Sequence, residues 1–307
     1  MKTRLKLVSL ALLALVFLLS CQGGVAQEAA PQPVDIILFS GQSNMAGRGE
    51  TSDAWPEGAP AILEGAGLEY RATSKEQKLF PIEEPFGVDE NKRGGIFEPK
   101  AKTGSMVTAF VNAYYENTGV PVIAISASQG GTSILQWQMD GKLLPDALER
   151  LKECIDYIQD SPEYEIRHIY VAWNQGTTDV DNGVDLDEYL NLFNATLQAM
   201  KDAGMEKMLL IRIGQYNVPG EEHLYDDMIR LQTRIAQENE DVVMVSCLMA
   251  GMLEMGLMKD EFHYYQAGYN LCGTDAGTHA AEYVNTGVEP TMEDPFFGNT
   301  YSVTSGL

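Results

Sequence analysis

The sequence contains few cysteines, few basic residues and few histidines. Its 307 residues include 4 cysteines, 4 histidines and 21 lysines and arginines, against 44 aspartates and glutamates. No cysteines form a C-x-x-C pair and none stands at a metal-type spacing from a histidine, so a zinc site is not expected. A fold built on disulfides is excluded at this length, although one disulfide among Cys154, Cys247 and Cys272 stays open.

The shortage of basic residues leaves the chain strongly acidic. The formal net charge is −23, and removal of the three basic residues nearest the N-terminus would take it to −26. Such a surface repels nucleic acid and anionic membranes, so neither is expected as a partner. A neutral sugar would not be repelled, whereas a polyanionic substrate would need a locally basic cleft.

One long apolar run stands at the N-terminus. Lys2, Arg4 and Lys6 precede the stretch LVSLALLALVFLL, which is too short for an ordinary membrane span and predicts a signal peptide over residues 1–20. The run ends in L-L-S-C, which predicts a lipoprotein with Cys21 as its lipid-bearing first residue, at the outer membrane of a Gram-negative bacterium. The alternative is plain secretion after cleavage near residues 25–27. Either way the protein would be exported, and it would contact a membrane only through the lipid.

The mature chain is expected to form one domain behind a short tether. Residues 21–33 are rich in Gly, Ala, Gln and Pro, a composition typical of a flexible linker. The length allows one or two domains. No linker-like segment interrupts residues 34–307, which favours a single catalytic domain.

Strand-like and helix-like segments alternate along the chain. Five segments are rich in Val, Ile and aromatic residues with almost continuous apolar character, which suits parallel strands covered on both faces. The alternation predicts a three-layer α/β/α sandwich with a five-stranded parallel sheet. The strand segments begin at Val34, Val120, Ile166, Lys207 and Asp241, and the helical segments lie near residues 105–116, 143–158, 185–204, 223–239 and 266–284.

Two regions do not follow this alternation. Residues 48–103 are rich in Gly, Pro and charge, and we expect them to form loops over the ligand-binding edge of the sheet. The tail from residue 285 is expected to be irregular. Six aromatic side chains in or near these loops could stack on sugar rings or could simply pack: Trp55, Tyr70, Phe80, Phe86, Phe97 and Trp137.

The first strand leads directly into G-Q-S-N-M-A-G, residues 41–47. Ser43 would lie on the turn after the strand, where its hydroxyl projects above the sheet and its amide can point at a substrate oxygen. For this serine alone, a polar turn or a helix cap is an equal alternative.

The second and third strands end in motifs that offer neutral hydrogen-bond donors. S-A-S-Q-G-G-T-S contains Gly130 and Gly131, whose backbone can approach a ligand closely and present N–H groups. W-N-Q-G-T-T-D contains Asn174 and Gln175, and neutral donors suit an oxyanion because they stabilise negative charge without a competing proton. Taken alone, the glycine pair is better explained by a tight turn, and Asn and Gln side chains commonly satisfy the backbone of a loop.

The motif K-D-E-F-H-Y follows the fifth strand. Asp260 stands three residues before His263, a spacing that lets the carboxylate reach the imidazole Nδ1 and leaves Nε2 free to accept a serine proton. An exposed histidine beside a chance carboxylate is the alternative. The other three histidines fall within predicted strands or helices or at a helix start.

The four motifs gain meaning from their positions. Each follows a different strand, and the carboxyl ends of parallel strands meet at one edge of a sheet. Together they supply the nucleophile, the base, the orienting carboxylate and the oxyanion donors that acyl transfer requires. The order Ser, Asp, His excludes the chymotrypsin and subtilisin arrangements, and the lack of G-x-S-x-G argues against an ordinary α/β-hydrolase.

These motifs, in this order, resemble the SGNH-type hydrolases, and more narrowly the group of carbohydrate esterase family 6 and the sialate O-acetylesterases. The resemblance covers residues 34–284 and implies a flavodoxin-like α/β/α fold, with no metal and no organic cofactor. It implies a catalytic triad of Ser43 as nucleophile, His263 and Asp260. It also implies an oxyanion hole formed by the amide of Ser43, an amide of Gly130 or Gly131, and the Gln175 side chain.

The third motif departs from the pattern of this group. The usual form is H-Q-G-E, whereas this chain has Asn174, Gln175, Gly176 and Thr177. In relatives the glutamate lies near the active site, so its loss would leave the orientation of His263 to Asp260 alone.

The resemblance predicts a carbohydrate O-acetylesterase that acts on an acetylated polysaccharide such as acetyl xylan. A sialate O-acetylesterase is one alternative, and a non-catalytic glycan-binding protein on the same fold is another. A general lipase is disfavoured by the acidic surface and by the lack of a long apolar lid segment.

Overall fold

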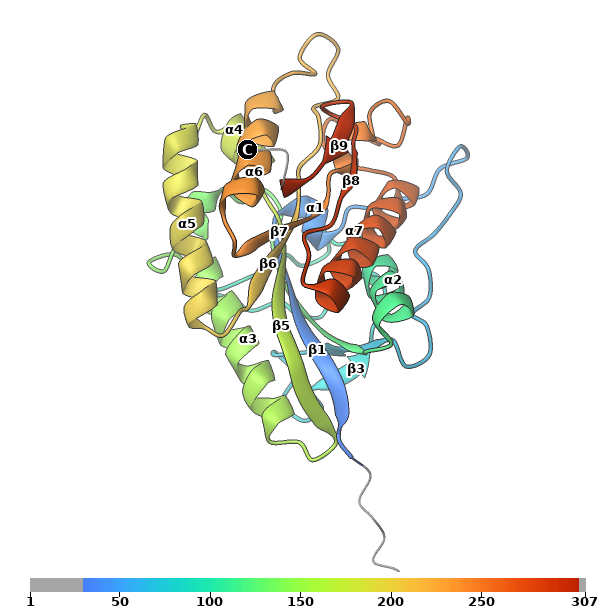
Figure 1. Ribbon diagram of the computed structural model, residues 1–307, viewed down its shortest axis with the longest axis vertical. Helices are drawn as coiled ribbons and strands as arrows, with labels where there is room; N and C mark the ends of the chain where they lie inside the picture. Colours follow the sequence, from blue (N-terminus) through green and yellow to red (C-terminus); the bar gives the residue numbers. More distant parts are fainter. Residues whose placement is uncertain (1–29, 304–307) are drawn as a thin grey trace, which may run out of the picture. The chain divides into compact units, whose positions relative to one another are not determined.

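A seven-stranded sheet forms the middle layer of the fold (Figure 1). The computed structural model describes residues 30–303, so the predicted signal peptide, Cys21 and most of the predicted tether lie outside the described residues. The strand order is β3-β2-β4-β1-β5-β6-β7, and every neighbouring pair is parallel except β2 and β3. The strands are β1 (Gln32–Gly41), β2 (Gly67–Tyr70), β3 (Leu79–Pro81), β4 (Val122–Ser128), β5 (Tyr164–Asn174), β6 (Lys207–Ile211) and β7 (Val242–Ser246).

The five predicted strands are present as β1, β4, β5, β6 and β7, but the prediction of a five-stranded sheet was wrong. The two further strands come from residues 48–103, which we expected to form loops only. They have 4 and 3 residues, too few for a clear apolar pattern. β3 ends in Pro81 at the edge of the sheet, where the missing N–H of proline breaks no ladder.

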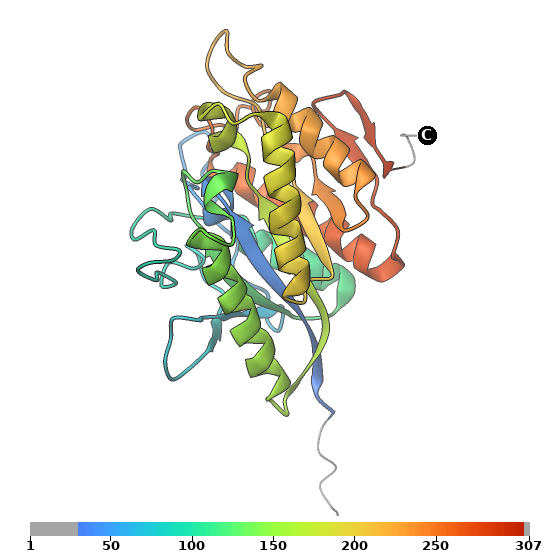
Figure 2. The same ribbon diagram turned by 90° about the vertical axis from the view of Figure 1, so that its left-hand side faces the viewer.

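Helices cover both faces of the sheet, as the alternation of segments predicts. α3, α5 and α6 lie on one face, which Figure 2 shows toward the viewer, and α2 and α7 lie together on the other side in Figure 1. The long helices are α2 (Val107–Thr118), α3 (Leu143–Gln159), α5 (Leu186–Asp202), α6 (Asp226–Glu238) and α7 (Gln266–Thr286). Shorter turns are α1 (Ser43–Ala46), α4 (Thr177–Asp181), η1 (Ile134–Gln136) and η2 (Leu248–Gly251).

The central strand β1 divides the core into two apolar layers. Ile36 and Leu38 belong to the layer under α3, α5 and α6, whereas Ile37 and Phe39 belong to the layer under α2 and α7. Successive side chains of a strand point to opposite faces, so a nearly continuous apolar run is what a strand buried on both sides requires. This pattern agrees with the position of β1 in the middle of the sheet, where the strand ends at Gly41.

Helices α2 and α7 approach each other closely because α7 carries glycines at the contact. A Cβ added at Gly273 would lie well inside contact distance of the Met106 carbonyl oxygen, and one at Gly277 would meet the Phe110 carbonyl in the same way. Only a residue without a side chain lets the backbones touch at these points.

The tail is more regular than expected. Strands β8 (Met292–Asp294) and β9 (Asn299–Tyr301) form an antiparallel hairpin after α7. Arg212, just after β6, holds this hairpin through two buried hydrogen bonds of 2.6 Å to the carboxylate of Asp294. A two-stranded hairpin this short is not stable by itself, so the ion pair and the packing beneath it give the tail its order.

Several sequence features can now be placed. Within residues 30–303, none of the helices has both the length and the apolar character that crossing a membrane requires. The three cysteines in this part, Cys154, Cys247 and Cys272, are buried and free. No group of three or more His, Cys, Asp or Glu side chains in the described part could hold a metal ion.

Candidate active site

Ser43 lies on a tight turn at the carboxyl end of β1. Gly41 has a φ of 136°, and a Cβ added there would lie 2.1 Å from the Asn174 carbonyl oxygen, so only glycine fits between the two strands. The Gln42 amide donates to the Asn174 carbonyl oxygen at 3.0 Å, and the Gln42 side chain accepts from the Gly176 amide at 2.9 Å. These contacts fix the turn to the end of β5 and leave Ser43 as the first residue of α1.

Ser43, His263 and Asp260 form a continuous chain of hydrogen bonds. The Ser43 Oγ lies 2.9 Å from His263 Nε2, and His263 Nδ1 lies 2.9 Å from Asp260 Oδ2. Ser43 is 7% exposed, and the side chains of His263 and Asp260 are 14% and 32% exposed. The structure therefore brings Ser43 to a histidine 220 positions further along the chain, and the two ring nitrogens of that histidine contact different partners.

Asp260 is held in place by the loop that carries it. Its Oδ1 accepts hydrogen bonds from the amides of Phe262 at 3.1 Å and His263 at 2.7 Å, which leaves Oδ2 for the imidazole. The Phe262 ring packs edge-on against the His263 ring, with 4.6 Å between centroids. The loop thus fixes both the carboxylate and the plane of the imidazole.

Asn44 ties this loop to the serine turn, a role that we did not predict from the sequence. Its Nδ2 donates to the Phe262 carbonyl oxygen at 3.0 Å, and its Oδ1 accepts from the Tyr269 hydroxyl at 2.6 Å. The residue next to the candidate nucleophile therefore positions the segment that supplies the candidate base.

The pKa shifts favour a neutral histidine beside an ionised aspartate. Burial lowers the pKa of His263 below its ordinary value, and the hydrogen bond and charge of Asp260 oppose this only in part. Burial alone would raise the pKa of Asp260, but the hydrogen bonds from Phe262 and His263 outweigh it, so this pKa lies below its usual value. At neutral pH the imidazole is then ready to accept a proton, as a general base must be.

Two of the predicted oxyanion donors have no protein acceptor in the described part of the chain, and a third is occupied. Within the described residues, the amides of Ser43 and Gly131 donate to no protein acceptor. Gly131 has a φ of 66° and nothing lies within 4 Å of the point where its Cβ would be. The Gly130 amide donates at 3.0 Å to the carboxylate of Glu98, a residue that the sequence did not single out.

The Gln175 side chain is not placed as the resemblance implies. It is fully buried, and its Nε2 donates to the Thr132 carbonyl oxygen at 3.2 Å and to the Asp179 carboxylate. Both amide hydrogens are therefore used inside the protein and none is left for an oxyanion. Gln175 belongs to the third motif, and its hydrogen bond to Thr132 connects that motif to the second.

The two replaced residues of the third motif also have structural contacts. Asn174 Nδ2 donates to the Ile211 carbonyl oxygen at 2.8 Å, which connects β5 to β6. The Thr177 hydroxyl accepts from the Gln42 side chain and so supports the serine turn. Among the described side chains, Asp260 is the partner of His263 Nδ1, as expected once the glutamate at position 177 is lost.

Most of the candidate sugar-stacking aromatics belong to the core. Tyr70, Phe86 and Trp137 are at most 2% exposed, and Trp55 and Phe80 are partly covered. Phe97 is 40% exposed, and its amide donates at 2.8 Å to Gln129, one residue before Gly130. Phe97 is therefore the member of this set best placed to meet a ligand near the serine.

A Ser–His–Asp chain at the carboxyl edge of an α/β/α sheet is the arrangement of a serine ester hydrolase. Comparison with family models makes this specific: the model described as carbohydrate esterase, sialic acid-specific acetylesterase matches residues 33–282. The chain belongs to this family and is an ester hydrolase, which confirms the resemblance inferred from its motifs.

Solved structures show the same fold. A protein from Arabidopsis thaliana is similar over 83% of this chain and 99% of its own, with 22% identity and a TM-score of 0.62. A carbohydrate acetylesterase from Xanthomonas citri is similar over 84% of this chain, which spans 57% of that protein, with 15% identity and a TM-score of 0.53. A search of curated proteins found no significant match.

Proposed function

We propose that this carbohydrate esterase removes acetyl groups from the hydroxyls of an acetylated polysaccharide, with Ser43 as nucleophile. The observation that carries the proposal is the unbroken hydrogen-bond chain from Ser43 Oγ through His263 to Asp260. Nucleophile, base and orienting carboxylate lie at hydrogen-bond distance in the order that acyl transfer requires.

The reaction would proceed in two steps. His263 Nε2 takes the Ser43 proton as Oγ attacks the acetyl carbonyl, and Asp260 stabilises the imidazolium that forms. The tetrahedral oxyanion is stabilised by backbone amides of Ser43 and the glycine pair. The sugar hydroxyl leaves with the proton from His263 and an acetyl-serine remains. A water then gives its proton to His263 and attacks this ester, which releases acetate and restores the Ser43 hydroxyl.

The charges around the site favour a neutral sugar over a sialic acid. Arg48 and Lys259 are the cations that act on His263, and each is paired with a glutamate, Glu98 and Glu50 respectively. No unpaired cation of this group is left to receive a sugar carboxylate, and the chain as a whole carries a charge of −23. An acetyl xylan-like polysaccharide is therefore the proposed substrate, and an O-acetylated sialic acid is the alternative.

The deciding experiment measures acetate release from acetylated xylan and from O-acetylated sialic acid, side by side. We expect release from xylan, and loss of about 10⁴-fold or more in kcat for Ser43→Ala. Ser74→Ala is the matched control, because this serine lies on a loop after β2 and its hydroxyl forms no hydrogen bond within residues 30–303. Wild-type rates for Ser43→Ala would sink the assignment, and binding of the glycan without any acetate release would indicate a non-catalytic glycan-binding protein.

We also propose that the protein is exported and anchored through a lipid on Cys21. The support is the sequence L-L-S-C after a basic and apolar leader, in residues outside those that the structure describes. Metabolic labelling with a fatty acid in a Gram-negative host should label the wild type, and Cys21→Ser should abolish the label. An unlabelled wild-type protein in the culture medium would instead support plain secretion.

A further inference from the structure

The carboxylate of Glu98 lies against the backbone next to Ser43. Its Oε1 accepts a hydrogen bond of 3.0 Å from the Gly130 amide and one from Arg48 Nη2. The side chains of Glu98 and Arg48 are 11% and 14% exposed. A protein carboxylate thus takes the hydrogen bond of Gly130, one of the two glycine amides that the resemblance implies for the oxyanion hole.

The geometry around Gly130 shows how near this carboxylate lies to the serine. A Cβ added to Gly130 would lie 2.6 Å from Glu98 Oε1 and 3.2 Å from Ser43 Cβ, and it would also overlap Arg48 Nη2. The side chains of Arg48, Glu98 and Ser43 therefore all lie close to Gly130. A negatively charged oxygen on a backbone N–H at this point has the chemistry of the tetrahedral oxyanion.

The segment that carries Glu98 is fixed by side chains from three directions. The amide of Ile96 donates to Asp146 at 2.8 Å, that of Phe97 to Gln129 at 2.8 Å, and that of Glu98 to Asn91 at 2.7 Å. These hydrogen bonds set the position of the Glu98 backbone, so its carboxylate reaches Gly130 from a fixed point.

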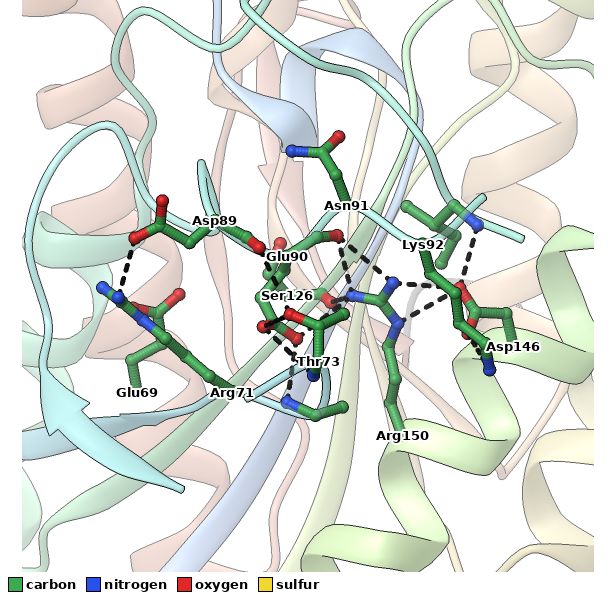
Figure 3. Close-up of polar contacts among 12 residues, drawn as sticks. Glu69, Arg71, Thr73, Asp89, Glu90, Asn91, Lys92, Ser126, Asp146 and Arg150 are labelled. Atoms are coloured by element: carbon green, nitrogen blue, oxygen red, sulfur yellow. Dashed lines mark hydrogen bonds and ion pairs between the residues drawn. The ribbon is translucent and has the colours of Figure 1, made fainter. Parts of the chain in front are cut away.

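A buried ion network anchors the base of this loop. Arg150 lies between Glu90 and Asp146, as Figure 3 shows, and it donates to the Glu90 carbonyl oxygen at 3.2 Å and to Asp146 at 3.0 Å. It also donates to the Ser126 carbonyl oxygen at 2.8 Å, on strand β4. Arg150 is 1% exposed, so the network joins the loop to α3 and the sheet through a buried guanidinium.

The hydrogen bonding of the carboxylate is incomplete. Glu98 Oε2 is buried and has no partner among the described residues. A buried acceptor without a donor costs free energy, so this contact of Glu98 is not fully stabilised. If a substrate oxygen replaced Glu98 Oε1, the Gly130 amide would still donate a hydrogen bond. The charge of Glu98 can remain compensated after such an exchange, because Arg48 and the buried Lys102 both lie within its electrostatic reach.

We propose that Glu98 is a resident carboxylate of the oxyanion site, which the acetyl carbonyl of the substrate must displace from the Gly130 amide. This inference rests on the proposed function for its catalytic meaning. A free carboxylate, including the acetate product, has the same chemistry as Glu98 and would bind the same donors. The resident residue therefore excludes product acetate, and it discriminates against esters that bind too weakly to displace it.

Acetate binding tests the proposal without relying on catalysis. In a Ser43→Ala background, the affinity for sodium acetate is measured by calorimetry at constant ionic strength, with and without Glu98→Ala. We expect Glu98→Ala to bind acetate at least tenfold more tightly, because a hydrogen bond to a charged group contributes at least about a factor of ten. Glu83→Ala, an exposed glutamate on the same stretch of chain, is the matched control and should leave the affinity unchanged. Equal affinities with and without Glu98 would overturn the proposal.

Kinetics with a chromogenic acetate ester give an independent readout. Glu98→Ala with Ser43 intact should show a lower KM and new competitive inhibition by acetate. Glu98→Gln keeps the shape of the side chain and weakens the pairing with Arg48, so it should show a smaller change in the same direction. If Glu98 only orients Arg48, both variants lose kcat and gain no acetate affinity, which would refute the proposal. If Ser43 is not the nucleophile, Ser43→Ala keeps its esterase activity while the acetate titration still gives its own answer.

Discussion

Replacement of Asp260 by Asn should test the triad more sharply than its removal. The Oδ1 of Asp260 accepts two backbone amides, from Phe262 and His263, and Oδ2 faces His263 Nδ1. An asparagine has one acceptor and one donor at these positions. Its oxygen will stay on the two amides, because the flipped amide would set its NH₂ against two N–H donors and would lose two hydrogen bonds of about 1 kcal/mol each.

This orientation sets the wrong tautomer of the histidine. The asparagine NH₂ then points at His263 Nδ1, which must act as an acceptor, so the proton of the neutral ring moves to Nε2. Nε2 lies 2.9 Å from Ser43 Oγ and in that tautomer cannot accept the serine proton. The same change in the serine proteases lowers kcat by about 10⁴-fold with the geometry intact, and we expect a loss of that order here.

The assay is steady-state hydrolysis of a chromogenic acetate ester at pH 7.5, with the thermal midpoint of each variant as a check on folding. Glu261→Gln is the matched control, since this neighbouring carboxylate is exposed and its removal changes the charge by the same amount. It should retain activity within about twofold. If Asp260→Asn keeps more than a tenth of wild-type kcat while folded, Asp260 does not set the tautomer and the reasoning fails.

Three further predictions follow from pKa values and packing. His263 must be neutral to accept the serine proton, and burial lowers its pKa. As the pH is lowered, kcat/KM should therefore stay constant until the pH is below the ordinary pKa of histidine, and should then fall about tenfold per pH unit. An inflection of the pH–rate profile above the ordinary pKa of histidine would contradict this. Burial raises the pKa of Glu69 to about 7, so the folded state binds a proton before the unfolded chain as the pH falls. In urea unfolding, the stability difference between Glu69→Gln and wild type should therefore change by about 2 kcal/mol in favour of Glu69→Gln as the pH rises from 5.5 to 8. A difference that is independent of pH would refute this. Gly273→Ala should lower the free energy of unfolding by about 2 kcal/mol, because the added methyl group overlaps the Met106 carbonyl. Gly58 has open space around it, so Gly58→Ala should leave the free energy of unfolding unchanged. Equal stability of the two variants would count against the close approach of α2 and α7.

The sequence was sufficient to predict the parts of the fold that depend on long apolar patterns. The strands that became β1, β4, β5, β6 and β7 are buried on both faces, so their residue types carry a strong signal. β2 and β3 lack this signal because they are short, and they owe their pairing to β4 and to each other. The β8–β9 hairpin depends on the Arg212–Asp294 contact, which joins residues 82 positions apart and leaves no local pattern.

The candidate site was predictable where function depends on local spacing. Asp260 and His263 lie on one loop, and the turn at Ser43 follows its strand directly, so motif and strand order together indicated their meeting. Glu98 gave no such signal, because it lies in a long loop whose path is set by Asp146, Gln129 and Asn91. The role expected of Gln175 failed for a similar reason: which way a buried amide turns depends on its neighbours, here Thr132 and Asp179.

The path of β1 also separates the start of the domain from the candidate active site. This strand begins at Gln32 on one edge of the sheet and ends at Gly41 beside the serine turn, a run of 10 residues that spans about 33 Å in extended form. Figure 1 shows it crossing the molecule from the end opposite α1. An attachment made through the residues before Gln32 would therefore join the domain at the end of β1 opposite the serine turn, with the length of the strand between it and Ser43.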